Sequence, residues 1–135
     1  MLAYSTSLLE MFDGYSFLAT LYTVLGCGVV PCWKLVRDRV GEELERSGGN
    51  LIVYRVEDRS VLETFLRAKV VEEAVEFAAS GSLEEAVDVF EALYEWLRLK
   101  GVGLDEVERV MREKRRVKGG FEKGYVVVWL DRETC

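Results

Sequence analysis

The sequence predicts a mainly α-helical fold with one short pair of β-strands. Most of the chain between residues 34 and 118 carries apolar residues at the three-to-four-residue spacing of amphipathic helices, interrupted by glycines. Two short runs, residues 51–56 and 125–130, are instead rich in β-branched and aromatic residues and predict strands. The strands could pair with each other, but the helices are longer and dominate the predicted fold.

Residues 14–33 form a segment without a charged side chain. Its length approaches the roughly 20 residues that a membrane-spanning helix needs. Two glycines and a proline interrupt its second half, and acidic residues precede it where a secretory signal would carry basic ones. We therefore expect residues 1–32 to be a hydrophobic extension that forms a packed helix, in the core or at a subunit interface, and not a membrane anchor.

Residues 33–135 are expected to form one domain, with a start or stop signal for each helix. The expected helices are one within 34–48 that ends at Gly48 and Gly49, one from Asp58 or Ser60 to Ala79 that stops at Gly81, one from Ser82 to about Lys100, and one over about 104–117.

The composition excludes several classes of function. A net charge of −6 argues against binding a nucleic-acid polymer through a basic surface. The chain has no histidine, which excludes a histidine base, a histidine-containing zinc site and Ser-His or Cys-His nucleophiles. Three cysteines without a zinc spacing indicate thiols in a reducing cytoplasm. The absence of glutamine and the single asparagine give a thermophile-like composition.

The acidic residues of the two central helices differ in where they project. Taken alone, the first helix places Glu72, Glu73 and Glu76 on one arc of about 100°, which predicts a solvated face. On the second helix, Glu85 projects into the apolar stripe instead. An ionised carboxylate there needs a partner, because burying an unpaired charge is costly.

Two explanations for Glu85 remain open. The sequence Ser82-Leu-Glu-Glu85 fits a capping box, in which the Glu85 carboxylate accepts from the Ser82 amide. Capping does not explain Asp88, one turn further along the same edge. An ExxE and an ExxD joined by a tight turn can instead bring four carboxylates together, and an all-oxygen ligand set indicates Mg²⁺ or Mn²⁺.

The last expected helix carries the opposite charge. Lys114 falls within its apolar stripe, where its ammonium either extends to solvent or faces the same interior as the acids. Its basic neighbours and the glycines at 119–120 suit the close approach of an anion. Carboxylates, a cation and this basic edge together indicate a polyphosphate held through a metal and attacked by water. Without histidine, a glutamate must deprotonate that water.

The ordered segments "KLVRDRV", "EEAVE", "EEAVD" and "EKRRVKGGF" resemble the MazG-like all-α nucleoside triphosphate pyrophosphohydrolases. More narrowly, they resemble the phosphoribosyl-ATP pyrophosphohydrolase-like proteins that begin with a KLVRDK-type segment. The resemblance spans about residues 33–130, and residues 1–32 have no counterpart in it. It implies a helical bundle that forms a homodimer or homotetramer.

The resemblance also implies a role for individual residues. The Mg²⁺ ligands would be Glu73, Glu76, Glu85 and Asp88, with Glu72 as the base outside the inner shell. Phosphates would be contacted by Lys114, Arg116 and Lys118. For Lys34 and Arg37, phosphate contact and structural pairing both remain open.

The expected function is hydrolysis of a nucleoside triphosphate between its α- and β-phosphates, giving a nucleoside monophosphate and pyrophosphate. Such an enzyme would maintain the nucleotide pool of the cytoplasm. The alternatives are hydrolysis of phosphoribosyl-ATP and, from a different class, a catalytically silent helical dimer that serves as an interaction module.

Overall fold

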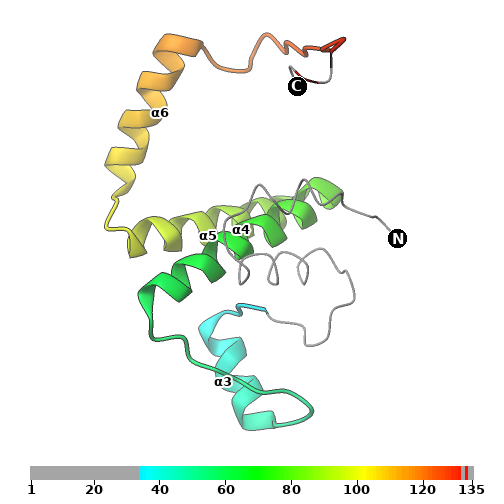
Figure 1. Cartoon of the computed structure of the whole chain (residues 1–135), viewed down its shortest axis with the longest axis vertical. Helices are drawn as coiled ribbons and strands as arrows, with labels where there is room; N and C mark the ends of the chain where they lie inside the picture. Colours follow the sequence, from blue (N-terminus) through cyan, green and yellow to red (C-terminus); the bar gives the residue numbers. More distant parts are fainter. Residues whose placement is uncertain (1–33, 132, 134–135) are drawn as a thin grey trace. The chain divides into compact units, whose positions relative to one another are not determined.

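The structure, a computed structural model, describes residues 34–131 and 133. These residues form four α-helices, which confirms the mainly α-helical prediction. The helices are α3 (Asp38–Ser47), α4 (Arg59–Ser80), α5 (Leu83–Leu99) and α6 (Leu104–Lys118) (Figure 1). The chain divides after Gly101 into two compact units, with α3, α4 and α5 in the first and α6 in the second. The extension expected at residues 1–32 lies outside the described residues.

Helix α4 begins and ends at local signals in the sequence. The Asp58 carboxylate accepts hydrogen bonds from the backbone amides of Ser60 and Val61 and from the Ser60 hydroxyl. These bonds lower the pKa of Asp58 below its usual value, because they stabilise the ionised form. At the other end, Gly81 adopts a left-handed conformation with φ 62° that a side chain would disfavour, and its amide donates to the Phe77 carbonyl.

Helices α4 and α5 form an antiparallel hairpin and the main helix–helix contact of the described residues (Figure 1). Ser82 caps α5 by accepting a hydrogen bond from the Glu85 amide. The core between the helices contains Leu66, Ala68 and Ala92, each less than one tenth exposed. The two alanines allow the backbones to approach closely, so the hairpin is held by a narrow apolar seam.

Polar contacts join the helices at the end of the hairpin far from its turn. The Trp96 indole donates to Glu63 over 3.3 Å, and Lys100 pairs with the same carboxylate over 3.5 Å. Residues from the start of α4 and the end of α5 therefore fix the register of the two helices.

Helix α6 is stabilised by contacts within itself. Acidic residues lie in its first turn and basic residues in its last, which complements the helix dipole. Arg109 pairs with Glu106, and Arg116 with Glu113, each over 2.7 Å and each largely exposed. No residue of α6 is buried, Lys114 included.

The two expected strands are not present in the structure. Residues 51–56 and 125–130 contain no strand, and most of their large side chains are exposed, with Ile52 at 77% and Val126 at 88%. A strand requires a partner for its backbone hydrogen bonds, and β-propensity mostly reflects packing against neighbours. The two segments belong to different units of the chain.

Within the part of the chain that the structure describes, no helix has the combination of length and apolar character needed to cross a bilayer. The uncharged segment at residues 14–33 lies outside this part.

Candidate metal centre

Three carboxylates from α4 and α5 converge beside the turn of the hairpin. One oxygen each from Glu73, Glu85 and Asp88 lie within 4.8 Å of one another. The short Gly81-Ser82 link reverses the chain, so the first two turns of α5 lie alongside the last turns of α4. Glu73 is buried, and the other two side chains are half-buried. Like charges this close repel each other, so the arrangement needs compensating positive charge.

The contacts of Glu85 distinguish between the two explanations that its sequence position leaves open, capping of Ser82 and metal ligation. Its amide donates to the Ser82 hydroxyl over 3.3 Å, which forms one half of a capping box. The other half is missing, because the Ser82 amide donates to the Ser80 hydroxyl over 3.2 Å. The Oε2 atom of Glu85 is buried and has no hydrogen-bond partner. Capping therefore does not use this carboxylate, and an unpartnered buried oxygen carries a desolvation cost.

Glu72 and Glu73 are buried, each 7% exposed, so the solvated face predicted from α4 alone is wrong for these two residues. The prediction considered one helix without its neighbours. In the structure, Lys34 pairs with Glu72, and Glu73 faces the acidic residues of α5. Glu76 is exposed, as the projection predicted.

Lys69 is a cation of this site that the sequence argument did not single out. Its ammonium lies 3.2 Å from Oε2 of Glu72 and 3.0 Å from Oε1 of Glu73. The signal was present in the sequence, because Lys69 precedes the two glutamates by three and four residues, the spacing of neighbours on one helix face. Its side chain is 17% exposed, so this ion pair is much less solvated than those of α6.

Lys34 and Arg37, which precede α3, bring positive charge to the same carboxylates. Lys34 lies 2.7 Å from Oε1 of Glu72, and this hydrogen bond raises the pKa of Lys34. Arg37 binds both Glu91 and Asp88, the latter over 2.6 Å, and these bonds raise its pKa. Both residues are thus paired with acids, and their contact with a phosphate stays a prediction. Glu91, which was not among the predicted site residues, is a second partner of Arg37.

The remaining predicted site residues are not members of the three-carboxylate cluster. Glu76 is not among the converging oxygens, although its negative charge contributes to the raised pKa of Lys34. Lys114, Arg116 and Lys118 are exposed residues of α6 in the second unit, where Arg116 pairs with Glu113. Their contact with phosphates stays a prediction.

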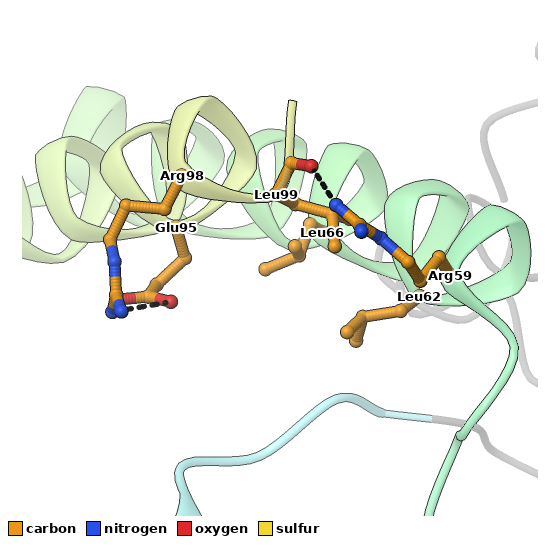
Figure 2. A pocket seen from close by; sticks show the side chains of 6 residues that line it. All are labelled: Arg59, Leu62, Leu66, Glu95, Arg98 and Leu99. Atoms are coloured by element: carbon orange, nitrogen blue, oxygen red, sulfur yellow. Dashed lines mark hydrogen bonds and ion pairs between the residues drawn. The ribbon is translucent and has the colours of Figure 1, made fainter. Parts of the chain in front are cut away.

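Two cavities border the hairpin, one at each end. A cavity of about 450 Å³ adjoins the cluster and is lined by Leu83, Glu84, Glu85, Val87 and Asp88. The other, of about 270 Å³, is lined by Arg59, Leu62, Leu66, Glu95, Arg98 and Leu99 (Figure 2). Figure 2 shows that Arg59 donates to the Leu99 carbonyl and that Arg98 pairs with Glu95. Both cations of this second cavity are therefore engaged within the protein, and the acidic end is the stronger candidate site.

The acidic end carries more negative than positive charge. Six carboxylates and three cationic side chains take part, leaving three negative charges uncompensated: Glu72, Glu73, Glu76, Glu85, Asp88 and Glu91, with Lys34, Arg37 and Lys69. An all-oxygen donor set with excess negative charge suits a hard divalent cation. Neighbouring oxygens around one octahedral Mg²⁺ at about 2.1 Å lie about 3.0 Å apart, so the three carboxylates would draw closer together around such an ion.

Comparisons of the chain with protein-family models, curated proteins and solved structures gave no match.

Proposed function

We propose that this chain is a Mg²⁺-dependent nucleoside triphosphate pyrophosphohydrolase of the MazG-like type, acting in the cytoplasm. One observation carries the proposal. Three carboxylates converge at the hairpin turn, and one of them has a buried oxygen that no hydrogen bond satisfies. A divalent cation would satisfy that oxygen and relieve the repulsion between the three carboxylates.

Glu73, Glu85 and Asp88 would hold the ion, and Glu76, one turn after Glu73, is the fourth ligand that the sequence resemblance implies. When bound, Mg²⁺ (or Mn²⁺) would polarise phosphoryl oxygens and make a bound water more acidic. Arg37 restrains Asp88 through its ion pair, which limits the rotamers from which that carboxylate can reach the ion.

Glu72 is the residue that we assign as general base. Both of its oxygens accept from ammonium groups, Oε1 from Lys34 and Oε2 from Lys69. The Lys34 side chain is 53% exposed and that of Lys69 is 17% exposed, so Lys34 is the freer of the two to move. A substrate phosphate would draw Lys34 away and free Oε1 to accept a proton from the attacking water.

The substrate we propose is a nucleoside triphosphate cleaved between its α- and β-phosphates, with Lys114, Arg116 and Lys118 contacting phosphates. Phosphoribosyl-ATP contains the same kind of bond and is the rival substrate. The polyphosphate would supply the negative charge that balances these cations and the divalent ion.

We also propose that the chain forms a homodimer or homotetramer. Leu83, Val87, Phe90 and Tyr94 recur at spacings of four, three and four residues on α5, which is the pattern of a helix–helix seam. They are between 37% and 81% exposed, because α4 covers a different face of α5. A second copy of the chain, aligning its own α5 with this seam, would bury them. The strands expected at 51–56 and 125–130 would also need a partner segment.

The proposed activity is tested by pyrophosphate release from a panel of nucleotides with and without Mg²⁺. We expect Glu73→Gln and Asp88→Asn to lower kcat/KM by about 100-fold or more, because replacing a residue that only hydrogen-bonds to a metal ligand already costs about 10- to 100-fold. Glu95→Gln is the matched control, since Glu95 also lies on α5 but at the other end of the hairpin and outside the cluster. If the wild type releases pyrophosphate from none of the nucleotides, the proposed enzymatic activity is wrong. If both variants react at the wild-type rate, the assignment of Glu73 and Asp88 as metal ligands is wrong.

A further inference from the structure

Lys69 differs from the other lysines and arginines that pair within one helix. The α6 pairs Glu106–Arg109 and Glu113–Arg116 use a similar spacing, but their side chains are between 50% and 71% exposed. Lys69 is 17% exposed, and the two carboxylates that it contacts have side chains only 9% exposed. Removing three charged groups from water is costly unless they compensate one another, so this pairing is more than a solvated surface contact.

The order of the residues also argues against a role in helix stability alone. Lys69 lies on the N-terminal side of Glu72 and Glu73. In an isolated helix this order is the less favourable one, because it opposes the helix dipole. The position is explained better by the site, because it places the ammonium 3.0 Å from a carboxylate that we assign as a metal ligand.

The charges of the three converging carboxylates show what Lys69 does. Asp88 is paired with Arg37, Glu73 is paired with Lys69, and Glu85 has a buried oxygen without a partner. Among the described residues, Lys69 is the one cation within ion-pair distance of Glu73. The three converging carboxylates are thus only partly compensated, because Arg37 is shared with Glu91 and Lys69 is shared with Glu72.

We infer that Lys69 is the internal counter-ion of the metal centre: it neutralises Glu73 when no divalent ion is bound and competes with the ion for that carboxylate. This inference rests on the proposed function. When the ion takes Glu73, the ammonium retains its second partner, Glu72, on the same helix face. This competition keeps the affinity of the site for a free divalent ion low.

The test measures Mn²⁺ affinity by electron paramagnetic resonance and thermal stability in EDTA, using the full chain. We expect Lys69→Met to lower the Tm without metal and to bind Mn²⁺ at least about tenfold more tightly, because a positive charge next to the ion is removed. Lys69→Arg, which keeps the charge, should bind Mn²⁺ like the wild type. Lys100→Met is the matched control, because it removes an ion pair from the other end of the same hairpin and should leave Mn²⁺ affinity unchanged.

The outcomes separate this inference from the function on which it rests. If the wild type binds Mn²⁺ and Glu85→Gln weakens that binding, but Lys69→Met binds no more tightly than the wild type, the metal centre stands and the counter-ion role is wrong. If the wild type binds no Mn²⁺, both are wrong. Should Lys69→Met not fold, the double variant Lys69→Met/Glu73→Gln removes both charges of the pair. It is expected to fold, and its failure to do so would overturn the pairing argument.

Discussion

At the scale of single residues, the contacts of Glu85 distinguish a candidate metal ligand from an ordinary helix-capping residue. Projection of the sequence correctly singled out this residue as an acid on the apolar side of its helix. It could not decide whether the carboxylate caps Ser82, because that depends on which acceptor the Ser82 amide chooses. In the structure the amide donates to Ser80, and the carboxylate stays available.

Replacing Glu85 with glutamine should stabilise the protein without metal and abolish its response to Mg²⁺. The neutral amide removes repulsion from Glu73 and Asp88, so we expect the Tm in EDTA to rise by a few degrees, about what 0.5–1 kcal/mol produces in a domain of this size. Wild-type protein should gain Tm when Mg²⁺ is added, as expected for a ligand that binds the folded state. Differential scanning fluorimetry in EDTA and in Mg²⁺ measures both. An equal Mg²⁺ response in the variant would contradict the role of Glu85.

Burial of Glu72 and Glu73 shows what a single-helix projection lacks. A single-helix projection gives the correct arc but assigns it to solvent, because the segment before α3 and the partner helix α5 cover this arc only in the folded chain. Lys69 was overlooked for a related reason, since a lysine three and four residues from two glutamates resembles a common surface pair. Its side chain is only 17% exposed, which the sequence alone does not reveal and which separates it from an ordinary surface pair.

At the scale of elements, the helix boundaries were predictable because their signals are local. The carboxylate of Asp58, the left-handed Gly81 and the hydroxyl of Ser82 each act within a few residues of their own position. The strands were not predictable in the same way, because a strand depends on a partner distant in sequence. Residues 51–56 and 125–130 have the composition of strands but form no strand in the structure.

The cap of α4 gives a prediction about pH. The hydrogen bonds to Asp58 hold its pKa below the usual value of 3.8, so its contribution to stability is present above about pH 4 and is lost as the pH falls through the lower, folded-state pKa. We expect Asp58→Ala to lower the Tm at pH 7, with a difference from wild type that shrinks at lower pH. Circular dichroism melts between pH 7 and pH 3 measure this difference.

Asp58→Asn is the control for the cap, because its amide oxygen accepts the same hydrogen bonds and does not titrate in this range. The difference in Tm between Asp58→Asn and Asp58→Ala should therefore change little with pH. If the difference between wild type and Asp58→Ala also stays constant down to pH 3, the carboxylate does not act through its ionised form.

At the scale of the whole molecule, the described residues expose more apolar surface on α5 than one hairpin can cover. Three of the large apolar side chains on its outer face are at least half exposed: Leu83, Val87 and Phe90. Contiguous exposed apolar surface of this kind marks an interface. The self-association that we propose accounts for it, and the sequence resemblance that predicted oligomers points in the same direction.

Phe90→Glu tests the oligomer, because it places a charge in the middle of the seam, where Phe90 is 62% exposed. We expect wild-type protein to sediment as a dimer or tetramer and the variant to sediment as a smaller species. Phe121→Glu is the matched control, since Phe121 is 99% exposed and lies outside α5; it should not change the sedimentation coefficient. A monomeric wild type in sedimentation velocity would exclude the proposed interface.

The central claim, that the hairpin turn holds a divalent cation, is tested most directly by locating Mn²⁺ with anomalous X-ray diffraction from crystals grown with the ion. We predict one strong anomalous peak bonded to carboxylate oxygens of Glu73, Glu85 and Asp88, at the roughly 2.0–2.2 Å typical of small hard cations. In that crystal the Lys69 ammonium should have left Glu73 and kept its contact with Glu72. Density that shows the three carboxylates without an ion at saturating Mn²⁺, or a peak elsewhere on the chain, would contradict the claim.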